Sequence, residues 1–599
     1  MKNVMATPAN RPHHNVELAA MFHQMALCYR YLGNEHRFRA MAYDVASRTV
    51  SGLKDDIAVY ATDIDTLDKL NGIGQSIGGK IMEYLATGKI RTFERLKKRV
   101  PEGLLELMEI KGFGPATVRH IHEALHVNNR EGVMEAIESG SLEQIKGFGS
   151  KRIENMSRGL KLYKESLARM LLFDALVLGN ELLNKVKVLP GVRKAELAGS
   201  LRRKKETIGD IDIVVEAEQK DWKKVVAKFV TLEGIERVLA KGNTRASIIL
   251  KQGGVQVDVR VVEEQQYGSA LFYFTGSKEH NIKLRTIAKG RGWKMNEYGV
   301  FDEVTGKRLA GTIEKDIYDL FDMQYVPPEL REERGEIEEA VSHTLPHLVE
   351  EADVRGDMQM HSNSSDGAED IETIASFILA NYPAYEYIVI TDHSPNARVA
   401  KGMKTEEFLK QFEKIDRVNR NLGKRFIMKG VEVDILNDGT LDLPDDLLGQ
   451  FDWVTASIHS GFTKDNTKRL VNACRHPYVH CIGHPGGRLI GKRIGYKVNW
   501  KELFEKAATT GTAIEINAQP ARLDLRDELV KDAIKQGVKM TVSTDAHALN
   551  QYQYMSLGIA VARRGWCTAN DVLNTYTWDA IEDFKRSKVT KRDRQILSV

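Results

Sequence analysis

Hydrophobic and polar positions follow a different period in each third of the chain. In the first third, apolar residues recur three and four positions apart over 16–50 and 91–108, which is the spacing of amphipathic helices. The middle third contains two alternating runs, "DIDIVV" at 210–215 and "GVQVDVRVV" at 254–262. Alternation with β-branched residues predicts strands. The pattern therefore predicts a helical region followed by a mixed region of helices and strands.

The last third repeats one unit. Short apolar runs end in polar residues, and helical stretches such as 404–422 and 500–510 separate them. Repeated strand and helix units predict a parallel sheet or barrel, in which the carboxyl ends of the strands share one face. The runs are "YEYIVITDHS", "RFIMKGVEVDI", "FDWVTASIHS", "YVHCIGHP", "GTAIEINAQ" and "VKMTVSTDAH".

Composition limits the class of protein. A chain of 599 residues, 42% hydrophobic and 28% charged, predicts several globular domains. It has no run of about 18 apolar residues, so no membrane span is expected, and its N-terminal stretch lacks a secretory h-region. The four cysteines are scattered without a CxxC pair, which argues for a reducing cytoplasm and against a disulfide framework. The net charge of +4 is a weak signal, whereas basic clusters such as "KIRTFERLKKR" fit contact with phosphates, with a merely solvated face as the competing interpretation of any single cluster.

Three short segments of the helical region resemble one another. They are "LNGIGQSIGGKI" (70–81), "IKGFGPATVRHI" (110–121) and "IKGFGSKRIENM" (145–156). Each has two glycines that permit a tight turn, followed by a helix whose N-terminus offers free N–H groups to a phosphate. The segments resemble helix-hairpin-helix motifs, which bind DNA without reading bases. The candidate DNA-binding glycines are Gly72, Gly74, Gly112, Gly114, Gly147 and Gly149.

Three carboxylates mark the strands of the middle third. Asp210 and Asp212 should point to the same face of one strand, because side chains repeat every second residue. If the second strand pairs beside the first, Asp258 completes a triad, and a divalent cation would relieve the repulsion between the acids. For Asp258 alone, a solvent-facing acid on an edge strand is the competing interpretation.

The neighbouring residues support a nucleotide site. Gly199 and Ser200 precede the acids and are followed by Arg202 and Arg203, so a hydroxyl, backbone N–H groups and guanidinium groups could hold a triphosphate. In "LFYFTGSKEHNIKLRTIAKGRGWKMNEYG", the sequence predicts a turn at 273–276 and a helix after it. The aromatic faces at this turn could stack on a base or sugar.

The motifs GSLRR…GDID, VDVR and YFTGS…N…R together resemble the palm and thumb of a family X DNA polymerase, the polymerase-beta-like group, over about 16–330. The resemblance implies that Asp210, Asp212 and Asp258 bind two Mg²⁺ or Mn²⁺ ions for in-line transfer of a deoxynucleotide from a dNTP. It places Ser200, Arg203 and Gly209 near the triphosphate. It also places Tyr273, Phe274 and Gly276 beneath the sugar and base, and Asn281 and Arg285 at the nucleotide and template.

The first helical segment also resembles the small lyase domain of eukaryotic members of this family. Lys80 falls where that domain has its Schiff-base lysine, and Tyr43 falls near its phosphate pocket. A lysine amine with a depressed pKa can attack the aldehyde of an abasic sugar. Ser76 replaces a second expected lysine, so contact of Lys80 with a phosphate is the alternative interpretation.

Polar residues at the predicted strand ends of the last third suggest a metal cluster. Histidine and carboxylate side chains are suitable ligands for manganese, iron or zinc. The motifs DMQMH…SDG, TDHS, GVEVDI, SIH, GHP and TDAH resemble the PHP (polymerase and histidinol phosphatase) domain, over about 353–599. That family implies a distorted (β/α)7 barrel with nine ligands for three metals, and eight of the nine positions match. The ligand positions are Gln359, His361, Asp366, His393, Glu432, His459, His484, Asp545 and His547.

Gln359 is the departure, because many members have histidine there. An amide oxygen is a neutral and weaker donor than imidazole. Alternation with Met358 and Met360 predicts that the Gln359 side chain still points with His361 toward the site. The resemblance implies a Mn²⁺-dependent 3′–5′ exonuclease, with Zn²⁺ or Fe²⁺ as other metals, in which His361 and His459 take part in catalysis. Some relatives also incise at abasic sites. A catalytically dead PHP scaffold is the alternative.

The expected protein is a monomeric, cytoplasmic and nucleoid-associated repair polymerase that fills gaps in DNA during base excision repair or end joining. Its substrates would be gapped or primer-template DNA and dNTPs, with no membrane partner. A nuclease whose polymerase is secondary and a small-molecule phosphatase are competing interpretations. The expected domains are a lyase-like helix-hairpin-helix domain (1–90), a DNA-binding helix-hairpin-helix domain (91–168), an α+β nucleotidyltransferase palm (169–262), a thumb (263–330), a linker or bridging helix (331–352) and the PHP domain (353–599).

Overall fold

The computed structural model describes residues 13–596, apart from 54–55, 71, 111, 155, 158–159 and 161–168. The chain forms two compact units, one of which joins Ala168–Arg355, Phe504–Val542 and Tyr554–Val599. None of the helices among the described residues is long and apolar enough to cross a membrane. The expected multidomain fold class is confirmed, with a helical region, a polymerase-like α+β region and a seven-stranded parallel sheet.

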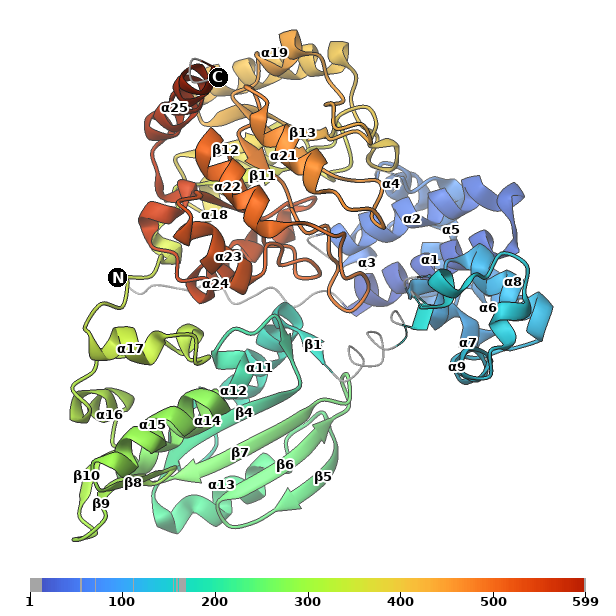
Figure 1. Cartoon of the computed structure of the whole chain (residues 1–599). Coiled ribbons are helices and arrows are strands. Elements are labelled where there is room, and N and C mark those ends of the chain that lie inside the picture. Colours follow the sequence, from blue (N-terminus) through green and yellow to red (C-terminus); the bar gives the residue numbers. More distant parts are fainter. Residues whose placement is uncertain are drawn as a thin grey trace. The chain divides into compact units, whose positions relative to one another are not determined.

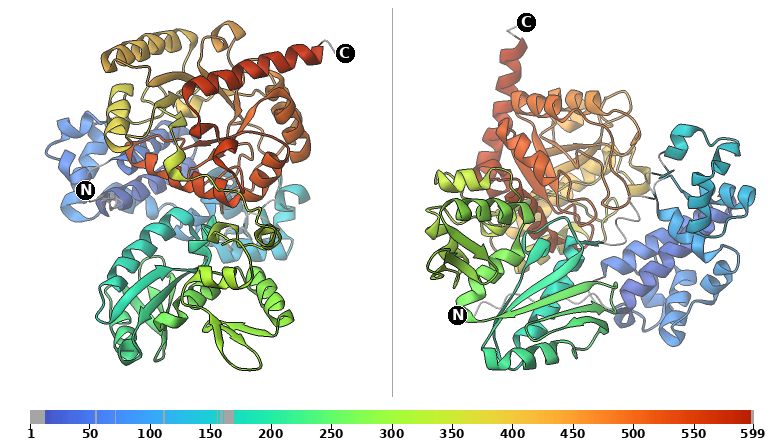
Figure 2. Two further views of the ribbon diagram at one scale, coloured as in Figure 1. Left: turned by 90° about the vertical axis from the view of Figure 1, so that its left-hand side faces the viewer. Right: turned by 60° about the horizontal axis from the view of Figure 1, so that its bottom comes forward.

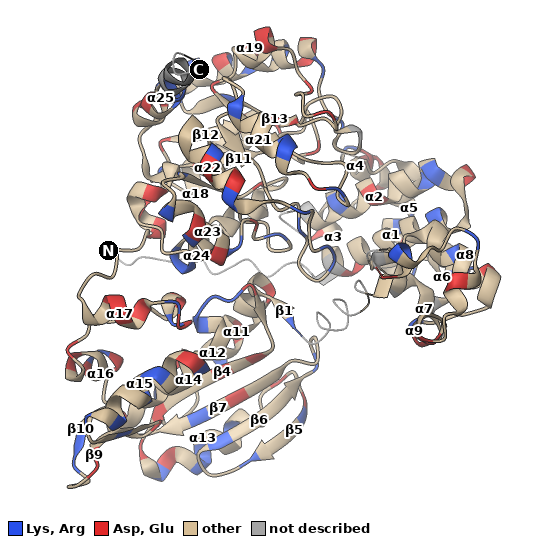
Figure 3. Ribbon diagram, in the orientation of Figure 1, with Lys and Arg blue, Asp and Glu red and all other residues tan. Residues whose placement is uncertain are grey.

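The first region consists of short helices. The two longest, α1 (His13–Leu32) and α2 (Arg37–Gly52), pack along each other. Their apolar residues join those of the later helices in one buried cluster that includes Phe22, Ile81 and Phe113. The helices after the glycine segments are α5 (Gln75–Thr87) and α8 (Pro115–Leu125). Both basic and acidic residues lie on the helices of this region (Figure 3).

The second region is built on a five-stranded sheet with the order β2-β4-β7-β6-β5. Helices α11 (Leu172–Lys187), α13 (Trp222–Phe229) and α14 (Tyr267–Thr275) pack against it, as Figure 1 shows. The strands are β2 (Val192–Leu197), β4 (Asp210–Ala217), β5 (Ile235–Lys241), β6 (Arg245–Leu250) and β7 (Gln256–Val262). Both alternating runs of the sequence are strands, and β4 and β7 are parallel neighbours.

The expected thumb (263–330) includes α14, α15 (Lys278–Gly290) and a three-stranded sheet. The stretch 331–352, expected to be a linker, contains helix α17 (Glu336–Val341), whose Ile337 and Ala340 join the buried cluster of Phe272 and Leu284. Arg331 and Glu336 in this stretch have no exposed surface. The stretch is therefore packed into the thumb core at its beginning rather than exposed throughout.

The C-terminal sheet has seven strands in consecutive order from β11 to β17, and the pairs from β11 to β15 are parallel. The strands are β11 (Gly356–Met360), β12 (Tyr387–Ile390), β13 (Ile427–Asp434), β14 (Trp453–Ser457), β15 (Cys481–Ile482), β16 (Ala513–Asn517) and β17 (Met540–Ser543). Every residue of these strands is buried except Lys429, because helices such as α19 (Thr405–Leu422) and α24 (Met555–Arg564) cover them, as in other parallel sheets. Helix α25 (Trp578–Ile596) follows the barrel and carries the described chain to its end (Figure 2).

Candidate active sites

The three carboxylates of the palm meet on adjacent strands. Asp212 on β4 lies directly opposite Asp258 on β7 in the parallel register. Carboxylate oxygens of Asp210, Asp212 and Asp258 lie within 4.8 Å of one another. Asp258 is therefore not an isolated acid on an edge strand, because β7 lies in the middle of the sheet.

Alternation fixes the direction of these side chains. Ile211 and Ile213 on β4 and Val257 and Val259 on β7 are buried on the opposite face of the sheet. Burying those apolar side chains holds the strands in register and leaves the aspartates on the open face. The sequence pattern alone thus determines which face carries the acids.

The triad concentrates negative charge. Burial, together with the charges of Asp210 and Asp258, raises the pKa of Asp212 to about 7. Asp258 accepts hydrogen bonds from Ser247 and from Gln256, the latter at 2.8 Å from Nε2 to Oδ2. Three oxygen donors that repel one another and are held in fixed positions are suited to divalent cations that prefer oxygen ligands.

A short helix brings the proposed triphosphate residues to the acids. Helix α12 (Gly199–Arg202) begins at Gly199, which has a φ of 60°. A Cβ atom at Gly199 would lie 2.1 Å from Oδ2 of Asp212, so only glycine allows the helix to approach the carboxylate this closely. Ser200 lies on this helix and Arg203 follows it. The positive charge of Arg203 acts on Asp212, where it partly offsets the rise in pKa.

The other residues expected to bind the nucleotide lie at the end of α14 and on α15. Tyr273 and Phe274 lie in the last turn of α14, whereas the sequence predicted a turn at 273–276, and the helix ends at Gly276 with a φ of 69°. The helix continues because its apolar side chains are packed against the palm and thumb. Asn281 and Arg285 lie on α15 as predicted, and Nδ2 of Asn281 donates to the Tyr273 carbonyl at 2.8 Å.

Gly209 occupies the position before β4. A Cβ atom there would lie 3.1 Å from Nη1 of Arg169, whose side chain donates to Thr207 through Nε at 2.9 Å. A guanidinium group thus lies beside the backbone of Gly209. Sequence reasoning did not select Arg169, because it lies about forty residues before the acids. The antiparallel pairing of β1 (Met170–Leu171) with β3 (Thr207–Ile208) brings it near them.

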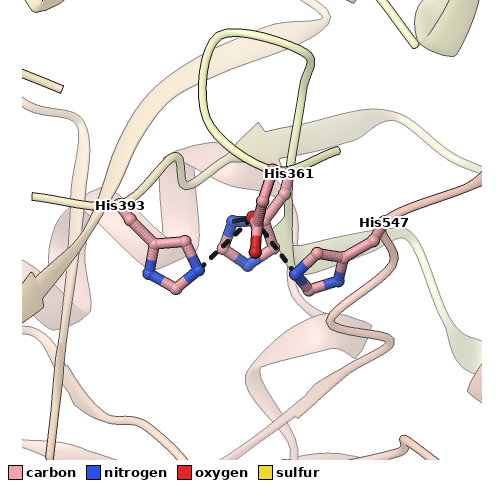
Figure 4. Close-up of side chains that lie close together, drawn as sticks. His361, His393 and His547 are labelled. Atoms are coloured by element: carbon pink, nitrogen blue, oxygen red, sulfur yellow. Dashed lines mark ion pairs between the residues drawn. The ribbon is translucent and has the colours of Figure 1, made fainter. Parts of the chain in front are cut away.

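The barrel residues form a second cluster. The imidazoles of His361, His393 and His547 converge on one carboxylate oxygen, Oδ1 of Asp366, with N–O distances of 4.0, 3.6 and 3.3 Å (Figure 4). These four residues come from sequence positions almost 190 apart. They form a group with potential ligand atoms within 4.8 Å of one another.

Two further groups share residues with the first. His393, Glu432 and His459 form one, and His361, Glu432 and Asp545 form the other. Nε2 of His484 lies 2.9 Å from Oε1 of Glu432. Three overlapping groups, each with nitrogen and oxygen ligands, are arranged as a cluster of divalent transition metals would require.

The charges of the cluster depend on one another. Burial opposes ionisation of Asp366, but His547 and His393 outweigh it and hold the Asp366 pKa well below its usual range. Burial would also lower the pKa of His547, yet the carboxylates of Asp366 and Asp545 raise it to about 10. Burial dominates at His393 and lowers its pKa to about 4. Protons and metal ions would therefore compete for the same atoms.

Gln359 is completely buried, and neither its amide oxygen nor its amide nitrogen has a hydrogen-bond partner among the described residues. The pairing of β11 with β12 shifts register between Asp357 and Met360, which is the mark of a bulge. That the Gln359 side chain points with His361 toward the site stays a prediction. A buried amide without a partner is destabilising, and a bound metal would supply one.

Asp434 is a site residue that the sequence reasoning missed. Its carboxylate pairs with Nδ1 of His459, while Nε2 of His459 lies 3.4 Å from Glu432. Carboxylates in this position orient a histidine ligand and raise its basicity. The available signal was alternation on β13, since Asp434 lies two residues after Glu432 and on the same face.

The glycine segments of the helical region have the expected turns. Gly72, Gly112 and Gly147 have φ angles of 77°, 95° and 92°. Gly74 and Gly114 immediately precede α5 and α8. A Cβ atom at Gly114 or Gly149 would meet nothing within 4 Å in the described part of the chain, so space for a phosphate is open at both helix starts.

Lys80 and Tyr43 lie near each other. Nζ of Lys80 lies 5.8 Å from the centre of the Tyr43 ring and donates to the Ser76 carbonyl at 2.7 Å and hydroxyl at 3.0 Å. Burial lowers the pKa of Lys80. A deprotonated amine is therefore more accessible at this position than at an open surface lysine.

The pKa of Asp212 generates a prediction for the metal-free protein. The substitution Asp212→Asn should raise the free energy of unfolding. The increase should grow as the pH rises from about 4 to about 7 and should stay constant at higher pH. The sign follows because the folded state holds a proton that the unfolded state has released over that range. Unfolding experiments in EDTA from pH 4 to pH 8 should show that the gain in free energy of unfolding reaches on the order of 3 kcal/mol at pH 8. The exposed Glu236→Gln on β5 controls for the loss of one charge, and a gain that does not vary with pH would contradict the argument.

Comparison with known proteins shows to which family the chain belongs. Family models match the chain as a DNA polymerase beta thumb at 270–332, a helix-hairpin-helix domain at 13–90 and a SAM-like helix-hairpin-helix tandem at 104–161. A probable phosphatase of Thermoanaerobacter sp. (strain X514) is 32% identical over 217 residues, which cover 34% of this chain and 83% of the relative.

A protein of Bacillus subtilis (strain 168) matches almost the whole chain. Its name is DNA polymerase/3′-5′ exonuclease PolX, and the two are 37% identical over 575 residues, or 95% of this chain and 99% of the relative. A match of this length includes the palm, the thumb and the barrel. The chain therefore belongs to family X of the DNA polymerases, in the group with a C-terminal PHP domain.

Proposed function

We propose that this protein fills gaps in DNA as a DNA-directed polymerase and trims 3′ ends with the barrel as a 3′–5′ exonuclease. The observation that carries the proposal is the presence of two separate ligand clusters in one chain, each suited to phosphoryl transfer. The relative from Bacillus subtilis is named for both activities. The helix-hairpin-helix segments support DNA as the partner, because they offer backbone N–H groups to phosphates.

In the palm, Asp210, Asp212 and Asp258 would hold Mg²⁺ or Mn²⁺. When bound, such cations lower the pKa of a primer hydroxyl and neutralise the charge of the triphosphate. Ser247 and Gln256 keep Asp258 oriented for this task. The incoming dNTP would be bound by residues of two groups. Those near the triphosphate are Ser200, Arg203 and Gly209, and those near the sugar, base and template are Tyr273, Phe274, Gly276, Asn281 and Arg285.

In the barrel, His361 and His459 belong to the catalytic cluster, with Mn²⁺ as the proposed metal and Zn²⁺ or Fe²⁺ as other metals. Mixed nitrogen and oxygen ligands favour transition metals over magnesium. The metals, when bound, activate water and hold the phosphate of a phosphodiester. Asp434 keeps the His459 ring oriented. The unpartnered amide of Gln359 supports an active site over an inactive scaffold, since a metal would satisfy it.

Two accessory activities are part of the proposal. Lys80 would form a Schiff base with an abasic sugar in the pocket near Tyr43, and the barrel would incise at abasic sites. The lowered pKa of Lys80 supports the first. With gap filling, these steps would make up a short repair sequence in one protein.

One gel separates the two main activities. On a gapped duplex with Mn²⁺, Asp258→Ala should lose primer extension and keep 3′-end degradation, whereas His361→Ala should do the opposite. Removing one such electrostatic contact should slow the affected step by about 100- to 1,000-fold. Addition of EDTA should stop both activities. The barrel would not be the exonuclease if His361→Ala still degraded 3′ ends. The same would follow if the wild-type protein degraded none with any metal.

Gln359→Leu tests the amide as a ligand, since leucine has a similar size and no donor atoms. The metal-free variant should be more stable by about 1–3 kcal/mol, because an unsatisfied buried amide is removed. Its additional stabilisation by Mn²⁺ should be smaller than that of the wild-type protein. Thermal unfolding with and without Mn²⁺ measures both effects. An unchanged Mn²⁺-dependent shift would show that Gln359 does not bind metal.

Borohydride reduction tests the lyase. Incubation with abasic DNA and borohydride should yield a covalent adduct that is absent from Lys80→Ala, because reduction traps only a Schiff base. Lys89→Ala, just beyond the end of the same helix, is the matched control and should retain the adduct. If no adduct forms while Lys80→Ala weakens DNA binding, Lys80 is a phosphate contact instead.

A further inference from the structure

A chain of ion pairs joins the polymerase segment to helix α24 of the barrel. Nε of Arg203 lies 3.1 Å from Oε1 of Glu332. Nη1 of Arg564 lies 3.0 Å from the same oxygen. Nη2 of Arg564 then lies 2.7 Å from Oδ2 of Asp527 on α23 (Asp527–Lys535). All four residues belong to one compact unit, although they come from distant parts of the sequence. Figure 3 marks acidic residues on α23 and basic residues on α24.

These groups are shielded from solvent. The side chains of Arg564, Glu332 and Arg203 are 3%, 11% and 13% exposed. Buried charges interact more strongly than surface pairs and are screened less by salt. Burial opposes ionisation of Glu332, but Arg564 and Arg203 outweigh it and hold the Glu332 pKa below its usual value.

Arg203 is held at several atoms. Besides the pair with Glu332, its Nη1 donates to the Thr275 carbonyl. Arg564 also donates to the backbone carbonyl of Arg203 at 2.6 Å. The position and the direction of the Arg203 guanidinium thus depend on Glu332 and Arg564. These contacts use Nε and Nη1 and leave Nη2 for a ligand.

The anchored guanidinium lies beside the carboxylate cluster. Arg203 acts on the charge of Asp212, and helix α12, which precedes Arg203, contacts that carboxylate through Gly199. A triphosphate that reaches the metals held by the acids would pass within reach of Arg203.

We propose that Arg564 and Glu332 are positioning residues for nucleotide binding: Arg564, on helix α24, pairs with Glu332 and with the backbone of Arg203, and the two residues hold Arg203 in the orientation that receives the dNTP triphosphate. The inference rests on the proposed function, since it takes Arg203 as a triphosphate ligand. It makes helix α24, which belongs to the same compact unit as the palm, a structural part of the polymerase site. Pre-organised charge of this kind lowers the free energy lost when a ligand binds.

The test is single-turnover filling of a one-nucleotide gap by the full-length protein with Mg²⁺. Arg564→Met should raise the dNTP concentration at half-maximal rate about tenfold, as expected when one charge-assisted contact is no longer aligned. The maximal rate should change less than about twofold, because the metal ligands are untouched. Arg564→Lys, which keeps the charge, should be intermediate. The exonuclease activity of the same preparations should equal that of the wild-type protein.

Arg563→Met is the matched control. Arg563 lies on the same helix and pairs with Glu329 of the polymerase segment at 2.9 Å, and its other hydrogen bond goes to the Val349 carbonyl rather than to Arg203 or Glu332. For Arg563→Met, the dNTP concentration at half-maximal rate should equal that of the wild-type protein. If Arg563→Met and Arg564→Met have equal effects, or if both activities and the melting temperature fall together, Arg564 has only a structural role and the inference is wrong.

Arg203→Met separates this inference from the proposed function. It should weaken nucleotide binding, and adding Arg564→Met to it should cause no further loss, because Arg564 acts through Arg203. If Arg203→Met has no effect, the assignment of Arg203 to the triphosphate fails. If Arg203→Met weakens binding but Arg564→Met does not, or if the two effects add, only the positioning role fails.

Discussion

The close packing of ionisable side chains is the constraint on which both sites depend: like charges repel in the palm triad, and carboxylates pair with imidazoles in the barrel. Three aspartates in the palm, and a larger set of carboxylates and imidazoles in the barrel, lie closer together than free side chains would remain in water. Apolar burial on the opposite strand faces holds them there. The palm strands are anchored through residues such as Ile213 and Val257, and the barrel strands are buried almost throughout. Apolar side chains buried away from the sites therefore hold the clustered side chains in positions that favour the binding of cations.

The two sites use this constraint differently. The palm triad consists of oxygen donors, and Asp210 is exposed, as suits a site that receives a large, charged and mobile nucleotide. The barrel cluster mixes nitrogen and oxygen donors, and most of its members are buried, as suits a resident metal cluster. Secondary contacts differ as well. A hydroxyl and an amide orient Asp258, whereas the carboxylate of Asp434 orients His459.

Buried ion pairs connect the end of the thumb to its surroundings. Arg331 contacts Glu314 at 2.6 Å, and Glu336 contacts His280 at 2.6 Å, all within the thumb and the stretch that follows it. Arg564 then reaches Glu332 from the barrel helix. Buried pairs contribute specificity of geometry more reliably than stability, because desolvation offsets much of their attraction. These pairs lie around Arg203 and α15, where the nucleotide is proposed to bind.

The sequence by itself determined the elements and most of the ligands. Periods of two and of three to four residues predicted the strands at Asp210 and Asp258, the helices of the first region and the parallel sheet of the last, because these periods follow from local backbone geometry. Tertiary structure alone decided which distant residues meet. It placed Arg169 beside Gly209 and Arg564 beside Glu332, and it extended α14 through Tyr273, where local turn signals were overridden by packing. It also introduced the shift in register beside Gln359, which the alternation of Met358, Gln359 and Met360 along the chain did not indicate.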